Sequence, residues 1–256
     1  MARREDSLQS RLERDLAELK LPEIAQNYRE VLDEAARKGS SMLEVLASLI
    51  GLEQAARQQR ALQRRLREAR LPKLKTLAEY DFTFPKRVPK AAILRLFDCD
   101  FIPQHGCAVL IGPTGTGKSH LLTALGYTAA ERGYSVRHTR VVDMINHLTT
   151  AQINGLLGKM LKSYVRPNLL LLDELGYLPI DKRGADLLFQ VVAARYESGS
   201  IVLTTNRPFR EWGALFDVDN TLATALIDRL MHHGEALVIQ GESYRMKDKA
   251  SDSTSA

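Results

Sequence analysis

The eight residues from 112 to 119 constrain this chain more than any other segment. They read Gly-Pro-Thr-Gly-Thr-Gly-Lys-Ser, the pattern of a phosphate-binding P-loop. A run of β-formers from Ala108 to Ile111 precedes them and a helical run beginning at His120 follows, as the motif requires. Glycines let the backbone curl so that successive N–H groups point at phosphate oxygens, and the dipole of the following helix adds to the attraction. The segment therefore predicts a strand, a phosphate-binding loop and a helix.

Each residue of this loop has an expected role in holding ATP. Lys118 is expected to place a point charge on the β and γ phosphates, and Ser119 to offer its hydroxyl to Mg²⁺. The residues predicted to contact the nucleotide are Gly112, Pro113, Thr114, Gly115, Thr116, Gly117, Lys118, Ser119 and His120. A glycine turn without a ligand is the alternative, which the strand before it and the helix after it disfavour.

Two acidic residues follow a run of leucines further along the chain. Leu169 to Leu172 suit a strand buried on both faces, and Asp173 and Glu174 come directly after them. A parallel strand that ends in an acid delivers it to the carboxyl edge of the sheet, where open α/β folds bind their ligands. We expect Asp173 to orient Mg²⁺ through its waters and Glu174 to act as general base on the attacking water. The alternative is a pair of acids that begin a surface loop.

Two later residues complete this set. Asn206 follows the apolar run from Ile201 to Thr205 and is expected to hold the attacking water or the γ-phosphate through its amide. A turn-forming Asn before a proline is the alternative. Arg229 lies in a helix predicted from Leu222 to His232 and is a candidate arginine finger for a neighbouring subunit, the alternative being a helix-surface arginine paired with a nearby acid.

The rest of the chain divides by its pattern. Residues 1–70 carry apolar residues at helical spacing, among them Leu8, Leu12, Leu16 and Leu19, and predict a small all-helical domain for DNA binding and oligomerisation. Residues 71–100 contain three prolines and predict a linker. Residues 101–248 alternate short strands with helices, which predicts a parallel sheet with crossover helices and hence an α/β fold. Residues 249–256 are small and polar and predict a disordered tail.

Composition adds few constraints. The net charge is +5, a mild indication of nucleic acid. The sequence contains no apolar run of about 20 residues, and its N-terminus is charged, so we expect a cytoplasmic protein with no membrane span. Cys99 and Cys107 are expected to remain reduced thiols. His232 and His233 are adjacent, and no Cys/His set has zinc-like spacing, so no structural metal is expected.

Basic residues concentrate in the segment that ends the helical domain. Between Arg57 and Lys75 lie eight basic residues and one acid, Glu68. On a helical wheel one face carries the candidate DNA-binding residues Arg57, Arg60, Arg64 and Arg67. Contacts from such a face to phosphates give affinity without sequence reading and a strong salt dependence. A solvated face, or one that pairs with acids of a neighbouring subunit, is the alternative.

The four motifs together resemble those of the AAA+ ATPases: Walker A, Walker B, sensor 1 and the arginine finger. The strings Asp-Glu-Leu-Gly-Tyr from 173 and Asn-Arg-Pro-Phe-Arg-Glu-Trp-Gly from 206 narrow the resemblance to the IstB family of transposition helper ATPases, which are related to the DnaC helicase loaders. The resemblance covers roughly residues 8–247. It implies an AAA+ P-loop fold with a reduced or absent lid domain, and a homo-oligomer that assembles head to tail on duplex DNA, as a ring or a filament.

The same resemblance implies partners and further contacts. The ATP-bound oligomer would present target DNA to a transposase, and basic residues between the second and third strands, Arg140, Lys159 and Lys162, would face that DNA. Arg245 would contact the nucleotide in a sensor 2 role. A helicase loader that acts on single-stranded DNA is the nearest alternative function. A nucleotide-gated clamp without catalysis is disfavoured by Glu174, and a small-molecule kinase by Arg229 and the basic helix.

Overall fold

The computed structural model of the chain describes residues 7–216 and 220–244. It divides into two compact units, residues 1–64 and residues 65–256. Among the described residues no helix combines the length and the apolarity needed to cross a bilayer. Each unit is described below by itself.

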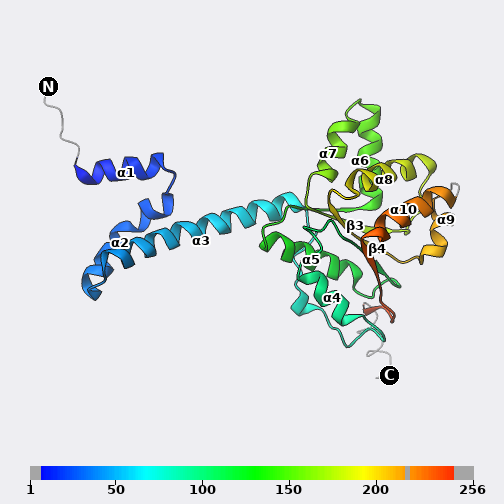
Figure 1. The fold of residues 1–256 in the computed structure, drawn as a ribbon, viewed down its shortest axis with the longest axis horizontal. Coiled ribbons are helices and arrows are strands. Elements are labelled where there is room, and N and C mark those ends of the chain that lie inside the picture. The colour runs from blue at the N-terminus through cyan, green and yellow to red at the C-terminus, as the bar shows by residue number, and fades with distance from the viewer. Residues whose placement is uncertain (1–6, 217–219, 245–256) are drawn as a thin grey trace, which may run out of the picture. The chain divides into compact units, whose positions relative to one another are not determined.

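The first unit is helical, as its apolar spacing predicts (Figure 1). Its helices are α1 (Leu8–Glu18), α2 (Pro22–Lys38) and the start of α3 (Met42–Ala69), which ends in the second unit. Pro22 is the first residue of α2, where its missing N–H costs no hydrogen bond. At the start of α3 the Ser41 N–H donates to Glu44 at 2.6 Å and the Glu44 N–H donates to Ser41 Oγ at 3.3 Å, a capping box.

The last turn of α3 belongs to the second unit, whereas the sequence placed the end of the helical domain at residue 70. Arg65 Nε donates to the carbonyl of Ala130 at 2.8 Å, and Ala69 is fully buried. These contacts hold the end of α3 against the larger unit, so the division lies between Arg64 and Arg65.

The second unit is built on five parallel strands in the order β2-β3-β4-β1-β5. The strands are β1 (Cys107–Ile111), β2 (Val136–Arg140), β3 (Leu169–Leu175), β4 (Ser200–Thr205) and β5 (Gly234–Val238). The sequence predicted the first four, as β-forming runs at residues 108–111, 135–139, 168–172 and 200–205. It missed β5, an edge strand with only one buried residue, so its apolar pattern is weak.

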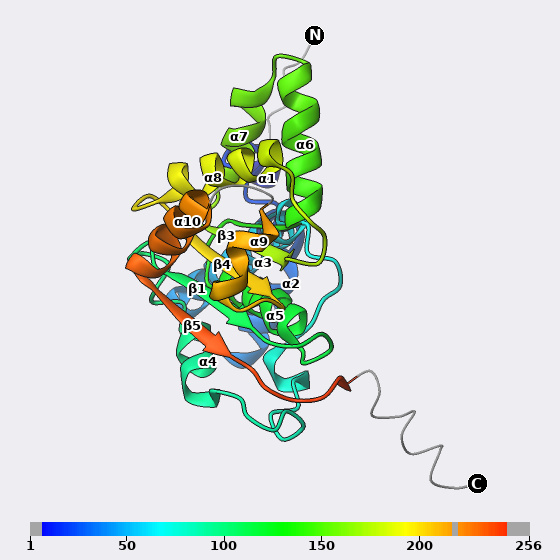
Figure 2. The same ribbon diagram turned by 90° about the vertical axis from the view of Figure 1, so that its right-hand side faces the viewer.

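Helices cover both faces of this sheet. Figures 1 and 2 show α4 and α5 on one side and α6, α8 and α10 on the other. The helices are α4 (Lys90–Phe97), α5 (Lys118–Glu131), α6 (Val141–Ile153), α7 (Leu157–Val165), α8 (Lys182–Arg195), α9 (Trp212–Leu215) and α10 (Asn220–His232), with short 3-10 turns η1 (Leu77–Glu79) and η2 (Phe209–Glu211). Leu169–Leu172 are fully buried, as a central strand covered on both faces requires. The fold is the AAA+ α/β fold that the motifs predict.

The segment 71–100 differs from the linker that its prolines suggested. It belongs to the second unit and ends in α4, which buries Ile93, Leu96 and Phe97. Arg87 and Gln240 exchange both backbone hydrogen bonds, at 3.0 and 2.8 Å. Prolines interrupt the periodicity of this segment but do not prevent it from packing along the unit, and that packing places its aromatic residues beside the P-loop.

Candidate nucleotide-binding site

The P-loop lies where the motif predicts, between the carboxyl end of β1 and the start of α5. Gly117 has φ of 87°, a left-handed conformation that favours glycine. A Cβ at this position would lie 2.5 Å from the ring of Tyr80, so a side chain would collide with the aromatic wall of the site. Glycine at residue 117 therefore avoids both a strained backbone conformation and a collision with Tyr80.

A pocket of about 220 Å³ opens over this loop. Its walls come from the loop and from three other parts of the second unit: residues 75–85, Glu174 with Tyr177, and Tyr244. Tyr80 donates its hydroxyl to the carbonyl of Thr116 at 3.1 Å, and the Tyr244 N–H donates to the carbonyl of Gly115 at 2.9 Å. Both residues fasten the P-loop from outside the motif.

Of the predicted nucleotide contacts, residues 114–120 line the pocket, whereas Gly112 and Pro113 do not. A Cβ at Gly112 would lie 2.3 Å from the carbonyl oxygen of Ile239, so this glycine permits the close approach of a neighbouring segment. Pro113 accepts hydrogen bonds from side chains of the loop through its carbonyl. His120 Nε2 lies 2.9 Å from the carbonyl of Thr76. Arg245 lies outside the described residues.

The structure brings the two predicted magnesium ligands together. Ser119 Oγ donates to Asp173 Oδ1 at 2.9 Å, and the same oxygen accepts a hydrogen bond from Thr204 on the adjacent strand β4. Burial alone would raise the pKa of Asp173, but the His138 imidazole, with Nε2 at 3.9 Å, and the two hydroxyls hold the pKa below its ordinary value. The residue is thus a carboxylate beside a hydroxyl, and these hard oxygen donors fit Mg²⁺.

Glu174 occupies a strained position at the edge of the pocket. Its φ is 64°, uncommon for a residue with a side chain, and the register between β3 and β4 shifts between Leu172 and Leu175. The Glu174 N–H donates to Asp173 Oδ1 at 3.1 Å and to Thr204 Oγ1 at 2.9 Å. These bonds stabilise a backbone turn at Glu174, which lines the pocket, while Asp173 hydrogen-bonds to Ser119 of the loop.

Asn206 follows β4 at the same carboxyl edge. Its Oδ1 is buried without a hydrogen-bond partner among the described residues, and Gly176 lies beside the amide. A buried carbonyl oxygen without a partner is costly, so this amide is suited to a ligand or a water. Asn206 does not line the pocket in this structure, and its role toward the attacking water stays a prediction.

Lys118 is buried beneath the loop, where its Nζ donates to the carbonyl of Pro113 at 2.7 Å. Burial lowers the pKa of Lys118 to about 8, and the nearby Asp173 opposes this shift. The folded, nucleotide-free chain therefore bears the cost of a desolvated ammonium group. Phosphate oxygens would offset that cost by supplying negative charge.

Lys118→Met is expected to raise the free energy of unfolding of the nucleotide-free second unit by about 1–3 kcal/mol at pH 7 and to abolish ATP binding. The penalty is fully present below pH 8, where the folded lysine is charged, and disappears as the pH rises from about 8 to 10.5, the ordinary value. Denaturant unfolding followed by fluorescence of Trp212, which is the only tryptophan and is buried in this unit, measures the difference. Substitution of the exposed Lys182 by methionine is the control. An equal rise in the free energy of unfolding for Lys182→Met would show that the rise in Lys118→Met does not come from removing a buried charge.

Arg229 lies at the other edge of the sheet. It shares a small pocket with Cys107 and Ile201, which stand at the amino ends of β1 and β4. Its guanidinium lies 4.6 Å from the ring centroid of Phe189, and Nη1 donates to the carbonyl of Ala225 at 3.2 Å. The five residues of β1 alone span about 16 Å, so Arg229 does not reach the phosphate pocket of its own chain.

The basic residues predicted to bind DNA fall into two groups. Arg57 and Arg60 pair with acids of their own unit, at 3.1 Å from Arg57 to Glu53 and at 3.0 Å from Arg60 to Glu23, so they differ from a free basic face. Arg140 makes two hydrogen bonds with Asp143, at 2.8 and 3.0 Å. The spacing of the arginines on α3 suggested a basic face, but acids neutralise part of it. Glu53 of the same helix pairs with Arg57, and Glu23 of α2 pairs with Arg60.

The second group is exposed. Arg64 and Arg67 lie on α3, and Lys159 and Lys162 lie three residues apart on α7, followed one turn later by Arg166. Within the described part of the chain these five side chains have no ion-pair partner. They are therefore accessible to an external anion.

Several residues that contact the site were assigned no role from the sequence. Two of them, Tyr80 and Tyr177, contact the P-loop. The other two, His138 and Thr204, contact the Asp173 carboxylate. Thr204 stands two residues before Asn206, and β4 pairs with β3, so a prediction of strand order would have brought it beside Asp173. The contact of Tyr80 with the P-loop and the position of His138 beside Asp173 were not predicted from the sequence.

Comparison with known proteins shows which family matches this chain. The model of a family described as IstB-like ATP binding protein matches residues 14–252. The chain is 38% identical over 234 residues to a protein named for insertion sequence IS21 and ATP binding from Pseudomonas aeruginosa, which covers 91% of this chain and 88% of that protein. A protein named in the same way for IS5376 of Geobacillus stearothermophilus is 38% identical over 231 residues, or 90% of this chain and 92% of that protein.

Solved structures show the fold. The DnaC helicase loader superposes with a TM-score of 0.53 at 22% identity and covers 64% of this chain and 96% of its own. AMPPCP-bound DnaA from Aquifex aeolicus superposes with a TM-score of 0.57 at 22% identity over 73% of this chain, which spans 57% of that longer protein. At these identities the likeness concerns the AAA+ architecture alone.

Proposed function

Since the chain belongs to the family of IstB-like ATP-binding proteins, we propose that it is an AAA+ ATPase that assembles on duplex DNA and presents that DNA to a transposase. The observation that carries the proposal is the division of the catalytic set between two edges of one sheet. Lys118, Ser119, Asp173 and Glu174 gather at the carboxyl edge, while Arg229 lies at the amino edge.

Hydrolysis is supported by the place of Glu174. This residue lines the pocket over the P-loop, one residue beyond the carboxylate that fits Mg²⁺. There it can accept the proton of a water that attacks the γ-phosphate. Bound Mg²⁺ would neutralise charge on the phosphate oxygens, held by Ser119 and Asp173. A site that only bound ATP would not need a general base, so Glu174 favours turnover.

Head-to-tail assembly is supported by the place of Arg229. An arginine at the amino edge can complete a phosphate site only in another subunit that turns its carboxyl edge toward it. Such a contact joins two different surfaces of the same chain and repeats to give a ring or a helical filament. ATP would strengthen this contact by supplying the anion that Arg229 meets, and hydrolysis would weaken it.

Contact with DNA is supported by the exposed cations of α7 and α3. Lys159 and Lys162 share one face of α7, and neither is neutralised by an acid among the described residues. Contacts of this kind read phosphate charge and leave the sequence unread, which suits a protein that accepts many target sites. The link to a transposase rests on the relatives, which are named for insertion sequences.

The test is binding to a random-sequence duplex and to a single strand of equal length, with and without ATP, across a salt series. We expect tight, cooperative duplex binding that requires ATP. Replacing both Lys159 and Lys162 by glutamine removes two phosphate contacts. The plot of log K against log salt has a negative slope, and the magnitude of this slope should decrease by about 2. The matched control replaces Lys182 and Arg210, two exposed cations on other elements, and should leave the slope unchanged.

A preference for the single strand would overturn the proposal in favour of a helicase loader, and a pull-down with a ring helicase would follow. A slope that fell equally in the control pair would remove α7 from the DNA interface and leave the ATPase assignment intact.

A further inference from the structure

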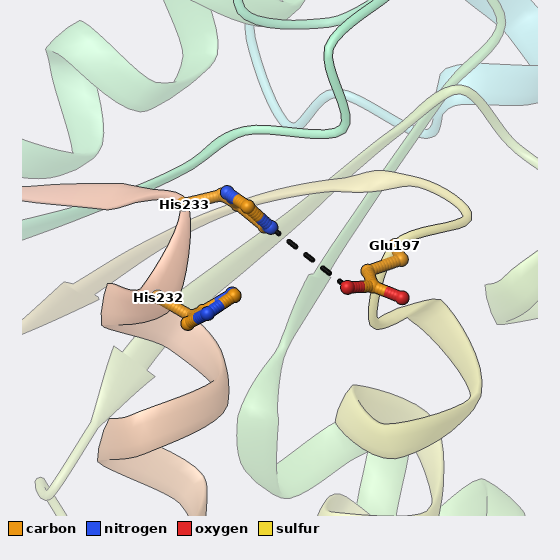
Figure 3. A group of neighbouring side chains, drawn as sticks. All are labelled: Glu197, His232 and His233. Carbon is orange, nitrogen blue, oxygen red and sulfur yellow. Dashed lines mark ion pairs between the residues drawn. The ribbon is translucent and has the colours of Figure 1, made fainter.

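Three side chains that can bind metal ions gather at the amino edge of the sheet, away from the phosphate pocket. Figure 3 shows Glu197, which follows α8, opposite His232 and His233 at the end of α10. One donor atom from each residue lies within 4.8 Å of the other two. His233 Nε2 is 3.9 Å from Glu197 Oε1, and the two imidazole centroids are 4.2 Å apart.

This cluster was not expected from the sequence, because adjacent residues of a helix project in different directions. The structure differs since α10 ends at His232, so that His233 already belongs to the turn into β5. The turn after α8, where Glu197 has φ of 56°, then brings a carboxylate from 35 residues earlier to the same place.

We propose that Glu197, His232 and His233 form a binding site for a divalent first-row transition-metal cation, for which Zn²⁺ is the probe. Two imidazoles and one carboxylate are donors that Zn²⁺ accepts, whereas Mg²⁺ and Ca²⁺ prefer oxygen alone. Zn–N distances of about 2.0–2.1 Å place tetrahedral donors roughly 3.3 Å apart. The three side chains are exposed, so small rotations can close the remaining gap.

The surroundings orient one of the ligands. The hydroxyl of Tyr196 lies 3.0 Å from Nδ1 of His232. If Nδ1 carries its proton toward the tyrosine oxygen, the lone pair remains on Nε2, the tautomer that binds a metal. Second partners of this kind fix ring orientation in metal sites generally. The set thus includes three ligands and one group that holds a ligand.

Neighbouring charges set the expected affinity. Arg195 and Arg229 line the same small pocket as Glu197 and His233, and their positive charge opposes a cation. Arg195 directs its guanidinium to backbone carbonyls, among them those of Tyr164 and Ser200. With one carboxylate and an open coordination position, we expect a roughly micromolar dissociation constant for Zn²⁺, weaker than structural zinc sites. A bound cation would clamp the end of α10, the helix that carries Arg229.

The experiment is a calorimetric titration of Zn²⁺ into the full chain without a histidine tag, in excess Mg²⁺ so that the phosphate site does not compete. We expect one Zn²⁺ per chain. His232→Ala, His233→Ala and Glu197→Gln should each weaken binding by about ten- to hundred-fold. His147→Ala on α6 is the matched control, because this histidine also meets a tyrosine hydroxyl, that of Tyr164 at 3.1 Å, but lies outside the cluster.

Co²⁺ provides a second readout, since thiolate ligands add a charge-transfer band that nitrogen and oxygen ligands lack. Cys107 lines the same small pocket, and a thiolate band would move the site there and overturn the proposed ligand set. Unchanged affinity in the three ligand variants, or no saturable binding at all, would also overturn it. Because the substituted side chains are exposed, thermal unfolding without metal should match the wild type and verify that each variant is folded.

Discussion

Glu174→Gln is expected to bind ATP with nearly unchanged affinity and to hydrolyse it about 10²- to 10⁴-fold more slowly, the range that a general base contributes. Glutamine preserves the size of the side chain and its place at the pocket edge but cannot accept a proton. The backbone turn depends on the Glu174 N–H, which donates to Asp173 and Thr204, and the substitution leaves these bonds in place. The loss should therefore appear in kcat and not in nucleotide affinity.

Two measurements separate this outcome from a folding defect. A fluorescent ATP analogue reports affinity, and phosphate release reports turnover. Asp186→Asn, which neutralises an exposed acid on α8, should leave both unchanged. The Glu174→Gln variant should also remain bound to duplex DNA in the presence of ATP, because it forms the ATP-bound assembly and cannot hydrolyse the nucleotide to leave that state. Normal turnover by Glu174→Gln would remove this residue from the base role.

The sequence was most informative for features that a short run of contiguous residues determines. The P-loop and the leucine strand each depend on neighbours within a few residues, and the structure places both as predicted. The expected parallel sheet added one step beyond local pattern. Residues near the carboxyl ends of parallel strands meet at one edge, so Asp173 and Asn206 were expected near the P-loop.

Contacts between distant segments were beyond such reasoning. Tyr80 lies in a proline-containing stretch that shows no helical or strand periodicity. Its hydroxyl nevertheless donates to the carbonyl of Thr116, and its ring leaves no room for a Cβ at residue 117. Arg57 and Arg60 were correctly placed on a helix. The i,i+4 spacing of Glu53 and Arg57 favours an ion pair, but nothing near Arg60 in the sequence indicated that Glu23 of α2 would meet it. Burial works to raise the pKa of Glu53, while the Glu23 N–H and the guanidinium of Arg57 hold it below its ordinary value. The Glu53 carboxylate therefore stays charged and forms ion pairs with both Arg57 and Arg60.

Arg229→Ala is expected to bind ATP normally but to lose about 10³- to 10⁵-fold in turnover, the range attributed to an arginine finger. In its own chain the guanidinium contacts only the ring of Phe189 and a helix carbonyl among the contacts described, so its removal should cost little stability. Arg229→Lys separates charge from shape, because lysine keeps the charge but lacks the planar fork that meets two phosphate oxygens. It should recover only a small part of the activity.

Mixing variants tests whether Arg229 acts on a neighbouring subunit. A Lys118→Ala chain binds no nucleotide but retains Arg229, so it can complete the site of an adjacent Arg229→Ala chain. An equal mixture that assembles at random head to tail should recover about a quarter of the wild-type rate per chain. A chain with both substitutions should restore nothing when mixed with Arg229→Ala, because it supplies neither a site nor an arginine. Equal rescue by that double variant, or no rescue by Lys118→Ala, would show that Arg229 does not complete a neighbour's site, and the division of the catalytic set between two edges would then need another explanation.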